Sequence, residues 1–335
     1  MRPFKYTPAI DTKTAVKALA GNQHAKFLAG GTNLLDLMKE DVERPNELVD
    51  ISRLKLSQVK QITADPDMGG LYIGALGKNS DAANHPLIRQ HYPLLSQAIL
   101  AGASAQIRNM ASNGGNLLQR TRCPYFYDVA MPCNKRVPGT GCAAMEGINR
   151  MHAIFGWSEK CIAVYPSDMS VALAAYEAKV TVQSVSGQER SIPFAEFHRL
   201  PGETPEKDNN LEHGELITAI TLPKNNFATH SYYLKVRDRA SYAFALISVG
   251  AALEIKDNTI MNVRIAMGGV AHKPWRASEA EKLLKGRKAT EVNFREAADA
   301  EMKNAKPLEH NKFKVELGSR GIVRALQVAI GANKK

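Results

Sequence analysis

Four cysteines lie close together in the middle of this 335-residue chain, and the chain contains no others. They are Cys123, Cys133, Cys142 and Cys161, with the spacing C-x9-C-x8-C-x18-C. Four cysteine thiolates can hold one [4Fe–4S] cluster. Zinc sites usually contain short C-x2-4-C pairs, which this spacing lacks, and two disulfides are an alternative in an oxidising compartment. The spacing alone therefore leaves a cluster, disulfides and zinc as three open interpretations.

Four basic residues lie beside these cysteines in the sequence, namely Arg120, Arg122, Lys135 and Arg136. A cluster held by four thiolates carries net negative charge. Because opposite charges attract most strongly when they lie close together, we expect these cations to offset the charge of a cluster.

Two glycine pairs offer a second kind of chemistry. One lies in residues 30–33, between an expected strand and an expected helix, and the other lies in residues 111–116. Paired glycines let backbone N–H groups approach a ligand closely, and such turns suit phosphate groups. Neither turn has the Rossmann or Walker spacing, so each by itself also fits an ordinary turn. Two such turns in one domain favour a ligand, because together they could clamp both ends of a dinucleotide.

Short helices and strands alternate around these turns. We expect helices over residues 12–21, 34–40, 93–101 and 169–176, and strands over residues 25–29, 47–51, 70–74 and 179–185. The stretch from Arg120 to Pro166 holds all the cysteines, is interrupted by prolines and glycines, and shows no sustained periodicity. A long irregular segment inside a compact domain usually serves a function.

A second domain is expected after residues 223–226, where Pro-Lys-Asn-Asn ends the preceding pattern. Residues 232–236, 243–255 and 263–267 are expected strands of an antiparallel sheet with helices at its end, which is an α+β arrangement. We expect the polar tail from Asn333 to be frayed.

The composition excludes several classes of function. The chain is 44% hydrophobic, as globular proteins are, and no apolar run approaches the roughly 20 residues of a membrane helix. The first residues lack the apolar segment of a secretory signal. The net charge of +11 is spread along the chain without a basic run, so we expect no nucleic-acid binding. An acidic protein partner or an anionic cofactor explains this charge better than nucleic acid does.

Several segments carry a resemblance to a known family, namely FLAGGTNLLDLMK (27–39), ASNGGNLLQ (111–119), the Ser167-Asp168-Met169 step and MGGVAHKPWRA (267–277). They resemble the FAD-binding medium subunit of the xanthine dehydrogenase, or molybdenum hydroxylase, family, and the resemblance runs nearly end to end. Within this family, the flavin subunits of periplasmic aldehyde oxidoreductases are most similar, judged by QRTRCPYFYD (119–128), PCNKR (132–136) and KVRDRASYAFAL (235–246).

The resemblance implies an α+β fold with two domains. Residues 1–224 would form a two-subdomain FAD-binding domain of the vanillyl-alcohol-oxidase (PCMH) type, and residues 225–335 a C-terminal α+β domain of the CO dehydrogenase flavoprotein type. Most family members lack about forty of the residues in the cysteine-bearing insertion, residues 117–166. A similar insertion in the flavin subunit of 4-hydroxybenzoyl-CoA reductase carries a [4Fe–4S] cluster, so the resemblance implies that cluster for the four cysteines.

The family pattern also implies the cofactor-binding residues, and no catalytic residue is expected in this chain. The residues carried over as FAD contacts are Phe27, Leu28, Ala29, Gly30, Gly31, Thr32, Asn33, Leu34, Gly102, Ser112, Asn113, Gly114, Gly115, Asn116, Asp168, Ile217 and Lys235. The two turns would cradle the pyrophosphate. Asp168 would bind the ribose or adenosine, Ile217 would pack on the flavin and Lys235 would reach its ring. Gly102 departs from the pattern, because several relatives have an aromatic residue over the isoalloxazine there.

Some of these residues also have ordinary structural interpretations. Asp168 precedes an apolar helix and would suit an N-cap, whereas Lys235 on a strand would be a solvated charge. His272 lies among turn residues and fits a turn histidine, and Trp275 fits a core residue.

These features together predict an FAD- and [4Fe–4S]-carrying electron-transfer subunit of a molybdenum-dependent aldehyde oxidoreductase. The resemblance implies a heterotrimer with a molybdopterin-binding large subunit and a [2Fe–2S] small subunit, from which electrons would pass to FAD and then to an external acceptor. It also implies a periplasmic complex, exported folded on a partner that bears the signal, with the cytoplasm as the alternative. The rival functions are a self-contained flavin oxidoreductase, which would need a general base over the flavin, and a non-enzymatic binding module stabilised by disulfides or zinc.

Overall fold

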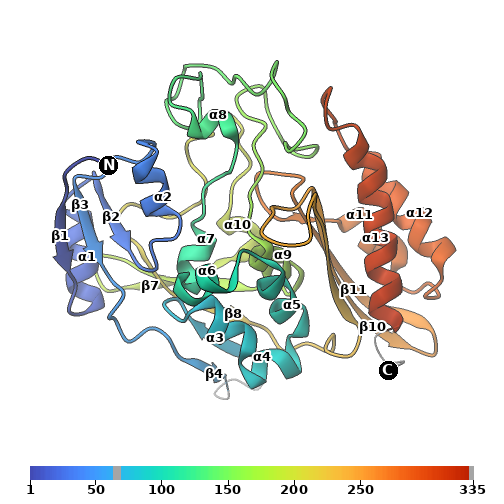
Figure 1. The fold of residues 1–335 in the computed structure, drawn as a ribbon. Helices are drawn as coiled ribbons and strands as arrows, with labels where there is room; N and C mark the ends of the chain where they lie inside the picture. Colours follow the sequence, from blue (N-terminus) through green and yellow to red (C-terminus); the bar gives the residue numbers. More distant parts are fainter. Residues whose placement is uncertain (63–68, 332–335) are drawn as a thin grey trace.

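The computed structural model describes residues 1–62 and 69–331, which form three sheets with helices packed between and around them (Figure 1). The first sheet is parallel and has the strand order β1-β3-β2. Its elements are β1 (Lys5–Pro8), α1 (Thr12–Ala20), β2 (Ala25–Leu28), α2 (Leu34–Lys39) and β3 (Glu47–Asp50). Asp11 and Thr14 form a capping box that begins α1. Because β2 leads directly into the first glycine turn and α2 follows it, this sheet positions that turn.

The second sheet is antiparallel and has the strand order β4-β5-β8-β6-β7. Its strands are β4 (Val59–Gln61), β5 (Leu71–Gly74), β6 (Lys179–Gln183), β7 (Glu189–Pro193) and β8 (Leu216–Leu222). The helices of this part are α3 (Asn79–Asn84), α4 (Pro86–His91), α5 (Pro93–Ala101), α6 (Ala105–Met110), α7 (Asn113–Leu117), α9 (Asp168–Ala175) and α10 (Phe194–Phe197). Helices α5 and α9 contact each other, and α9 is buried from Met169 to Ala175. The second glycine turn lies at the start of α7.

The C-terminal part forms the third sheet, with the strand order β12-β11-β10-β9. Its elements are β9 (Ser231–Val236), β10 (Ile247–Lys256), β11 (Thr259–Gly268), β12 (Trp275–Arg276), α11 (Ser278–Leu284), α12 (Glu291–Met302) and α13 (Phe313–Gly331). Neighbouring residues of β10 contact helices on opposite sides of the sheet: Gly250 lies against Leu94 of α5, and Val249 lies against Gly321 of α13. Burial on both faces explains the mainly apolar sequence of β10 from Ile247 to Leu253.

The cysteine-bearing insertion, residues 117–166, crosses the top of the molecule as drawn in Figure 1. Its one named element is the short helix α8 (Pro124–Tyr127), so the predicted irregular segment is confirmed. Phe126 of α8 is fully buried and packs with Leu37 of α2 and Cys133. On the other side of the insertion, Lys314 of α13 donates to the carbonyl oxygen of His152, and Asn311 just before α13 donates to the same atom. The insertion is therefore anchored both to the first sheet and to the C-terminal helices.

The predicted helices and strands are confirmed, with ends that differ by a few residues. The strand predicted over residues 243–255 begins only at Ile247, because the residues before it form a loop. The tail from Asn333, expected to be frayed, lies outside the described residues. None of the helices in the part of the chain that the structure describes combines the length and apolar character of a membrane crossing.

Lys314 of α13 allows a test of this anchoring. Its side chain is fully buried and donates to the carbonyl oxygens of His152 and Gly269 at 2.9 and 2.8 Å. Burial, with a smaller effect from Arg150, lowers the pKa of Lys314 from 10.5 to about 7. Between these two pKa values the unfolded chain binds more protons than the folded protein. The contribution of Lys314 to stability therefore rises with pH across this window.

We predict that Lys314→Met removes the rise in stability with pH that the buried Lys314 contributes. The free energy of unfolding of the wild-type protein, relative to that of the variant, should increase by at most about 1.4 kcal/mol per pH unit between about pH 7 and 10. Thermal unfolding at several pH values measures this difference. Lys312→Met, at the exposed neighbour, is the matched control and should keep the wild-type pH dependence. A constant difference between wild type and Lys314→Met at every pH would contradict the prediction.

Candidate functional site

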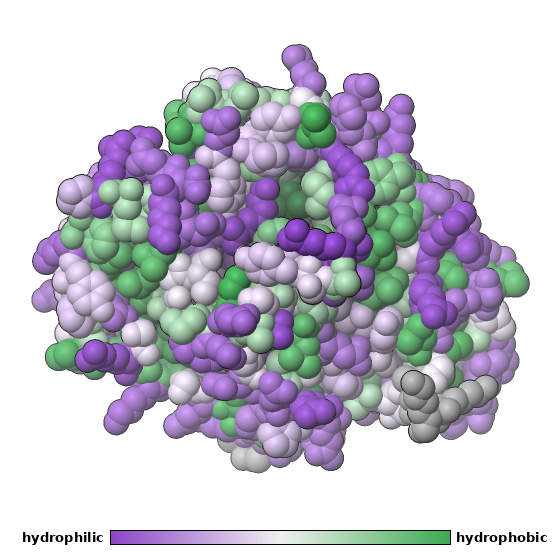
Figure 2. All heavy atoms as spheres, in the orientation of Figure 1, coloured by the Kyte–Doolittle hydropathy of each residue, from purple (hydrophilic) through white to green (hydrophobic). Residues whose placement is uncertain are grey.

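A large cavity lies at the centre of the molecule and is lined by residues from all three sheets. Its volume is about 1390 Å³, which exceeds the roughly 300–1,000 Å³ of ordinary ligand pockets. Figure 2 shows a hollow near the centre of one face, with hydrophilic side chains around it. Every FAD contact predicted from the sequence except Asn113 lines the cavity. These are Phe27, Leu28, Ala29, Gly30, Gly31, Thr32, Asn33, Leu34, Gly102, Ser112, Gly114, Gly115, Asn116, Asp168, Ile217 and Lys235.

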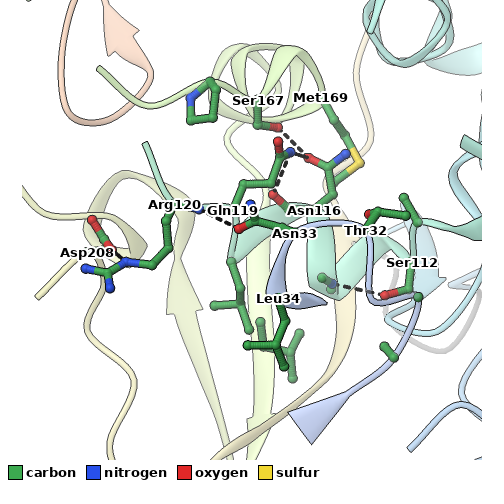
Figure 3. A pocket seen from close by; sticks show the side chains of 18 of the residues that line it. Thr32, Asn33, Leu34, Ser112, Asn116, Gln119, Arg120, Ser167, Met169 and Asp208 are labelled. Carbon is green, nitrogen blue, oxygen red and sulfur yellow. Dashed lines mark hydrogen bonds and ion pairs between the residues drawn. The ribbon is translucent and has the colours of Figure 1, made fainter. Parts of the chain in front are cut away.

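The two glycine turns lie against each other on the cavity wall (Figure 3). A Cβ on Gly30 would come within 2.1 Å of the carbonyl oxygen of Met110, so glycine is required for the first turn to approach the second. Gly31 has a φ of +71°, in the left-handed region that disfavours side chains. Ser112 begins α7, and its hydroxyl accepts a bond from the N–H of Gly115 at 3.2 Å. The two turns that the sequence predicts to act together are therefore adjacent.

Side-chain amides hold the second turn in place. Asn79 donates to Asn113 at 3.0 Å, and Asn116 donates to Asn79 at 2.7 Å. Asn116 also accepts bonds from Ser167 and Gln119 at 2.5 and 2.9 Å (Figure 3). Asn113 is 1% exposed and lies behind the turn, outside the cavity lining. Its position is that of a residue that supports the turn.

Asn33 anchors the first turn to the start of the insertion. Its Oδ1 accepts a bond from the backbone N–H of Arg120 at 3.0 Å (Figure 3). Its Nδ2 is buried and has no partner among the described residues. Buried donors without a partner are rare in folded proteins, so this amide fits a site that a polar ligand completes.

Asp168 and Lys235 form a buried ion pair across the cavity wall, from α9 to β9. Their charged atoms lie 2.8 Å apart, and the Lys235 side chain is only 5% exposed. Tyr233 also donates to Asp168, at 2.6 Å. Two ordinary interpretations from the sequence are therefore wrong. Lys235 is not a solvated charge, and the N-cap of α9 is Ser167, whose hydroxyl accepts from the N–H of Ser170 at 3.1 Å.

The Asp168 carboxylate lies close to position 102. A Cβ on Gly102 would lie 3.1 Å from it, so a side chain there would have to pack directly against the ion pair. Arg108 donates to the carbonyl oxygen of Gly102 at 2.6 Å and fixes this end of α5. The adjacent Ala103 has a φ of +51°, a strained value of the kind that clusters at binding sites.

The loop between β9 and β10 also lines the cavity, which the sequence analysis missed. Its Tyr242 has a φ of +50°, and both Tyr242 and Phe244 are exposed aromatic residues. The insertion contacts this loop twice. The Arg122 guanidinium lies 5.3 Å from the centre of the Phe244 ring, and Arg150 makes two bonds to Asp238 at 2.9 and 2.8 Å. The sequence feature that could have revealed this loop as part of the site is its pair of aromatic residues, Tyr242 and Phe244, in a polar segment.

The fold gathers the four cysteine thiols, all of which are free. Cys133 and Cys142 pair across a short antiparallel bridge, and the thiols of Cys142 and Cys161 are hydrogen-bonded to each other. Cys123 lies near enough to Cys133 and Cys142 for their charges to raise its pKa further. The cysteines that the sequence grouped by spacing are therefore neighbours in space.

Backbone N–H groups point at three of the sulfurs and favour their thiolate forms. They come from Tyr125 and Phe126 for Cys123, from Ala144, Met145 and Ile162 for Cys142, and from Ala163 for Cys161. Burial nevertheless raises the pKa of Cys123 to about 12. The hydrogen bond between Cys142 and Cys161 lowers the pKa of Cys142 and raises that of Cys161, so Cys142 is the more acidic of the pair.

The basic residues beside the cysteines are mostly occupied elsewhere, which corrects the expected charge compensation. Arg120 and Lys135 both bind Asp208, and Arg122 binds Asp36 at 2.7 Å. Burial alone would raise the pKa of Asp208, but Lys135 and Arg120 lower it to about 2. The charge of Lys135 also acts on a cysteine, since it opposes the raised pKa of Cys161.

Two buried histidines contact the thiols, and the sequence analysis identified neither contact. His152 Nε2 lies 3.1 Å from the Cys123 sulfur, and His272 Nε2 lies 3.3 Å from the Cys161 sulfur. His272 is thus more than a turn histidine. Trp275, expected in the core, stacks on Phe155 and is half-buried. Over residues 1–62 and 69–331, no three His, Cys, Asp or Glu side chains are gathered closely enough to hold a single metal ion.

Comparisons with known proteins identify the family. The FAD-binding domain in molybdopterin dehydrogenase matches residues 2–225, and the CO dehydrogenase flavoprotein C-terminal domain matches residues 232–332. The chain belongs to the FAD-binding medium subunits of the molybdenum hydroxylase family. These medium subunits bind FAD and are parts of multisubunit oxidoreductases, so the predicted flavin cofactor and enzyme class are confirmed.

Individual relatives agree with this assignment. The chain is 47% identical to the aldehyde oxidoreductase FAD-binding subunit PaoB of Escherichia coli (strain K12), over 98% of this chain and 99% of that protein. It is 31% identical to the glyceraldehyde dehydrogenase medium chain of Sulfolobus acidocaldarius, over 85% and 82%. A solved carbon monoxide dehydrogenase chain from Hydrogenophaga pseudoflava shares the fold, with a TM-score of 0.76, 24% identity, and coverage of 99% and 98%. The predicted α+β fold class is confirmed.

We predict that Gly31→Val lowers the affinity for FAD about tenfold or more. A left-handed conformation costs a side-chain-bearing residue about 1–2 kcal/mol, and about 1.4 kcal/mol is a tenfold change in affinity. Flavin absorbance per purified chain and titration with added FAD measure the effect. Gly31→Asn is the matched control and should retain more flavin, because asparagine tolerates this conformation better. Equal and normal flavin content in both variants would remove this turn from the site.

Proposed function

We propose that this protein is the FAD- and [4Fe–4S]-carrying electron-transfer subunit of a molybdenum-dependent aldehyde oxidoreductase. The proposal rests on one combined observation: a dinucleotide-sized cavity and four gathered thiols occur in a chain 47% identical to an aldehyde oxidoreductase flavin subunit. Electrons from partner subunits would pass to FAD and from FAD to an external acceptor. The redox chemistry belongs to the cofactors, while the protein positions them and sets their surroundings.

The cavity wall supplies what FAD requires. The two glycine turns would hold the pyrophosphate with their N–H groups, since glycine lets the backbone approach a phosphate closely. The buried pair of Lys235 and Asp168 would place both a donor and an acceptor at the cofactor, and Ile217 would give it an apolar surface.

The cysteine site favours an iron–sulfur cluster over the alternatives. Backbone N–H groups near three sulfurs lower the pKa of each thiol, although larger effects still raise the pKa values of Cys123 and Cys161. Thiolates are the ligands of such a cluster. A four-iron cluster is wider than a single ion, so its ligands surround a larger space than those of zinc. The four free thiols of one insertion supply the number of ligands that such a cluster needs.

The implied partners are a molybdopterin-binding large subunit and a [2Fe–2S] small subunit. The net charge of +11 favours acidic surfaces on the partners. We propose that the chain divides at residues 224/225 into an FAD-binding domain and a C-terminal domain. A periplasmic location, reached in the folded state on a signal-bearing partner, remains a proposal that rests on the resemblance.

We predict that the full-length chain, purified without oxygen, shows flavin absorption bands and a broad iron–sulfur shoulder. It should contain about four irons and four acid-labile sulfides. Flavin bands without iron would instead support a self-contained flavin oxidoreductase. Absence of both chromophores would support a disulfide- or zinc-stabilised binding module, which zinc analysis and mass shifts after alkylation would distinguish.

Replacing one cysteine tests the ligand assignment. We predict that Cys133→Ser loses most of the iron, because an oxygen ligand is a poor replacement for a soft thiolate. FAD should be less affected, since its turns lie at residues 30–33 and 111–116. Val137→Ser is the matched control in the same loop, at an exposed position, and should keep its iron. Iron below about one atom per wild-type chain, against the four of a full cluster, would refute the cluster and leave the FAD assignment standing.

A further inference from the structure

Two histidines from distant parts of the chain reach the sulfurs of the cysteine site. His152 lies within the insertion, and His272 lies between β11 and β12, 111 residues after Cys161. Both are buried, with 2% and 8% of their surface exposed. Each ring places Nε2 on the sulfur, at 3.1 Å for Cys123 and 3.3 Å for Cys161. Two independent elements therefore provide the same contact.

The surroundings of each ring indicate which nitrogen carries the proton. In both histidines, Nδ1 is buried and has no partner in the described part of the chain. A neutral imidazole has one N–H donor and one acceptor nitrogen. A buried N–H without a partner is rarer than a buried acceptor without one. The proton therefore belongs on Nε2, and each ring donates to a sulfur.

The backbone at and beside the two histidines is held by hydrogen bonds. The backbone N–H of His152 donates to Asn149 at 3.0 Å, and its carbonyl oxygen accepts bonds from Lys314 and Asn311 at 2.9 and 3.2 Å. Next to His272, the carbonyl oxygen of Ala271 accepts the N–H of Tyr165 at 3.0 Å. These bonds fix the backbone that carries each ring, through residues of the insertion and of the C-terminal part.

We propose that His152 and His272 are positioning residues that donate N–H hydrogen bonds to the Cys123 and Cys161 thiolates and thereby raise the reduction potential of the cluster. The inference rests on the proposed [4Fe–4S] cluster. Reduction adds negative charge that spreads onto the sulfurs, and N–H donors stabilise the reduced state more than the oxidised state. Hydrogen bonds to sulfur are among the factors that set the potentials of such clusters.

The test compares variants with and without an N–H donor at each position. His152→Leu and His272→Leu remove the donor, whereas His152→Gln and His272→Gln place an amide N–H near the same point. The full-length proteins are titrated with dithionite, and the reduced cluster is followed by electron paramagnetic resonance alongside iron and sulfide analysis. We expect each Leu variant to lower the midpoint potential and the double Leu variant to lower it further. The Gln variants should restore most of the shift.

His198 offers a matched control. It is equally buried, but its Nε2 bonds the carbonyl oxygen of Leu117 at 2.9 Å and no cysteine. His198→Gln should therefore leave the cluster potential unchanged. Unchanged potentials in both Leu variants with normal iron would overturn the inference. Loss of iron from both the Leu and the Gln variants would also overturn it, because the rings would then serve the fold alone. Absence of iron from the wild-type protein would instead refute the proposed cluster.

Discussion

The carboxylate of Asp208 is the point on which the arrangement of the two sites depends. It is largely buried and binds both Arg120 and Lys135, while Arg120 also binds Glu43 at 2.7 Å. Removing one partner would leave Lys135, whose side chain is only 2% exposed, or the partly buried Asp208 without full compensation of its charge. Arg120 also donates its backbone N–H to Asn33. One charge network therefore fixes the insertion, the first glycine turn and the loop around Asp208 relative to one another.

Local patterns in the sequence were sufficient to predict many of the helices and strands. The capped helix α1, the strand before the first glycine turn and the apolar helix α9 were predicted, because caps, glycine pairs and apolar periodicity act within a few residues. The same holds for the grouping of the cysteines by spacing. Gly102 was recognised as a departure from the family pattern, but its surroundings could not be predicted. The carboxylate beside it belongs to Asp168, far away in the sequence.

What the sequence did not predict depends on contacts between distant segments. Arg120 and Arg122 lie next to Cys123 in the chain, yet their charges bind acids on other elements. Proximity in sequence was therefore a poor guide to charge compensation. The place of Tyr242 at the cavity could not be predicted from the sequence either, since the position of its loop is set by the pairing of β9 with β10.

The late position of α13 has a consequence for synthesis on the ribosome. Lys314 donates to the carbonyl oxygen of His152, a contact between residues 162 positions apart. The cysteines thus leave the ribosome long before the residues that close their surroundings, at the usual pace of about 5–20 residues per second. During that interval the insertion lacks the hydrogen bond that α13 makes to it. The cysteine-bearing segment therefore reaches its final set of contacts only after the last helix of the chain has been made.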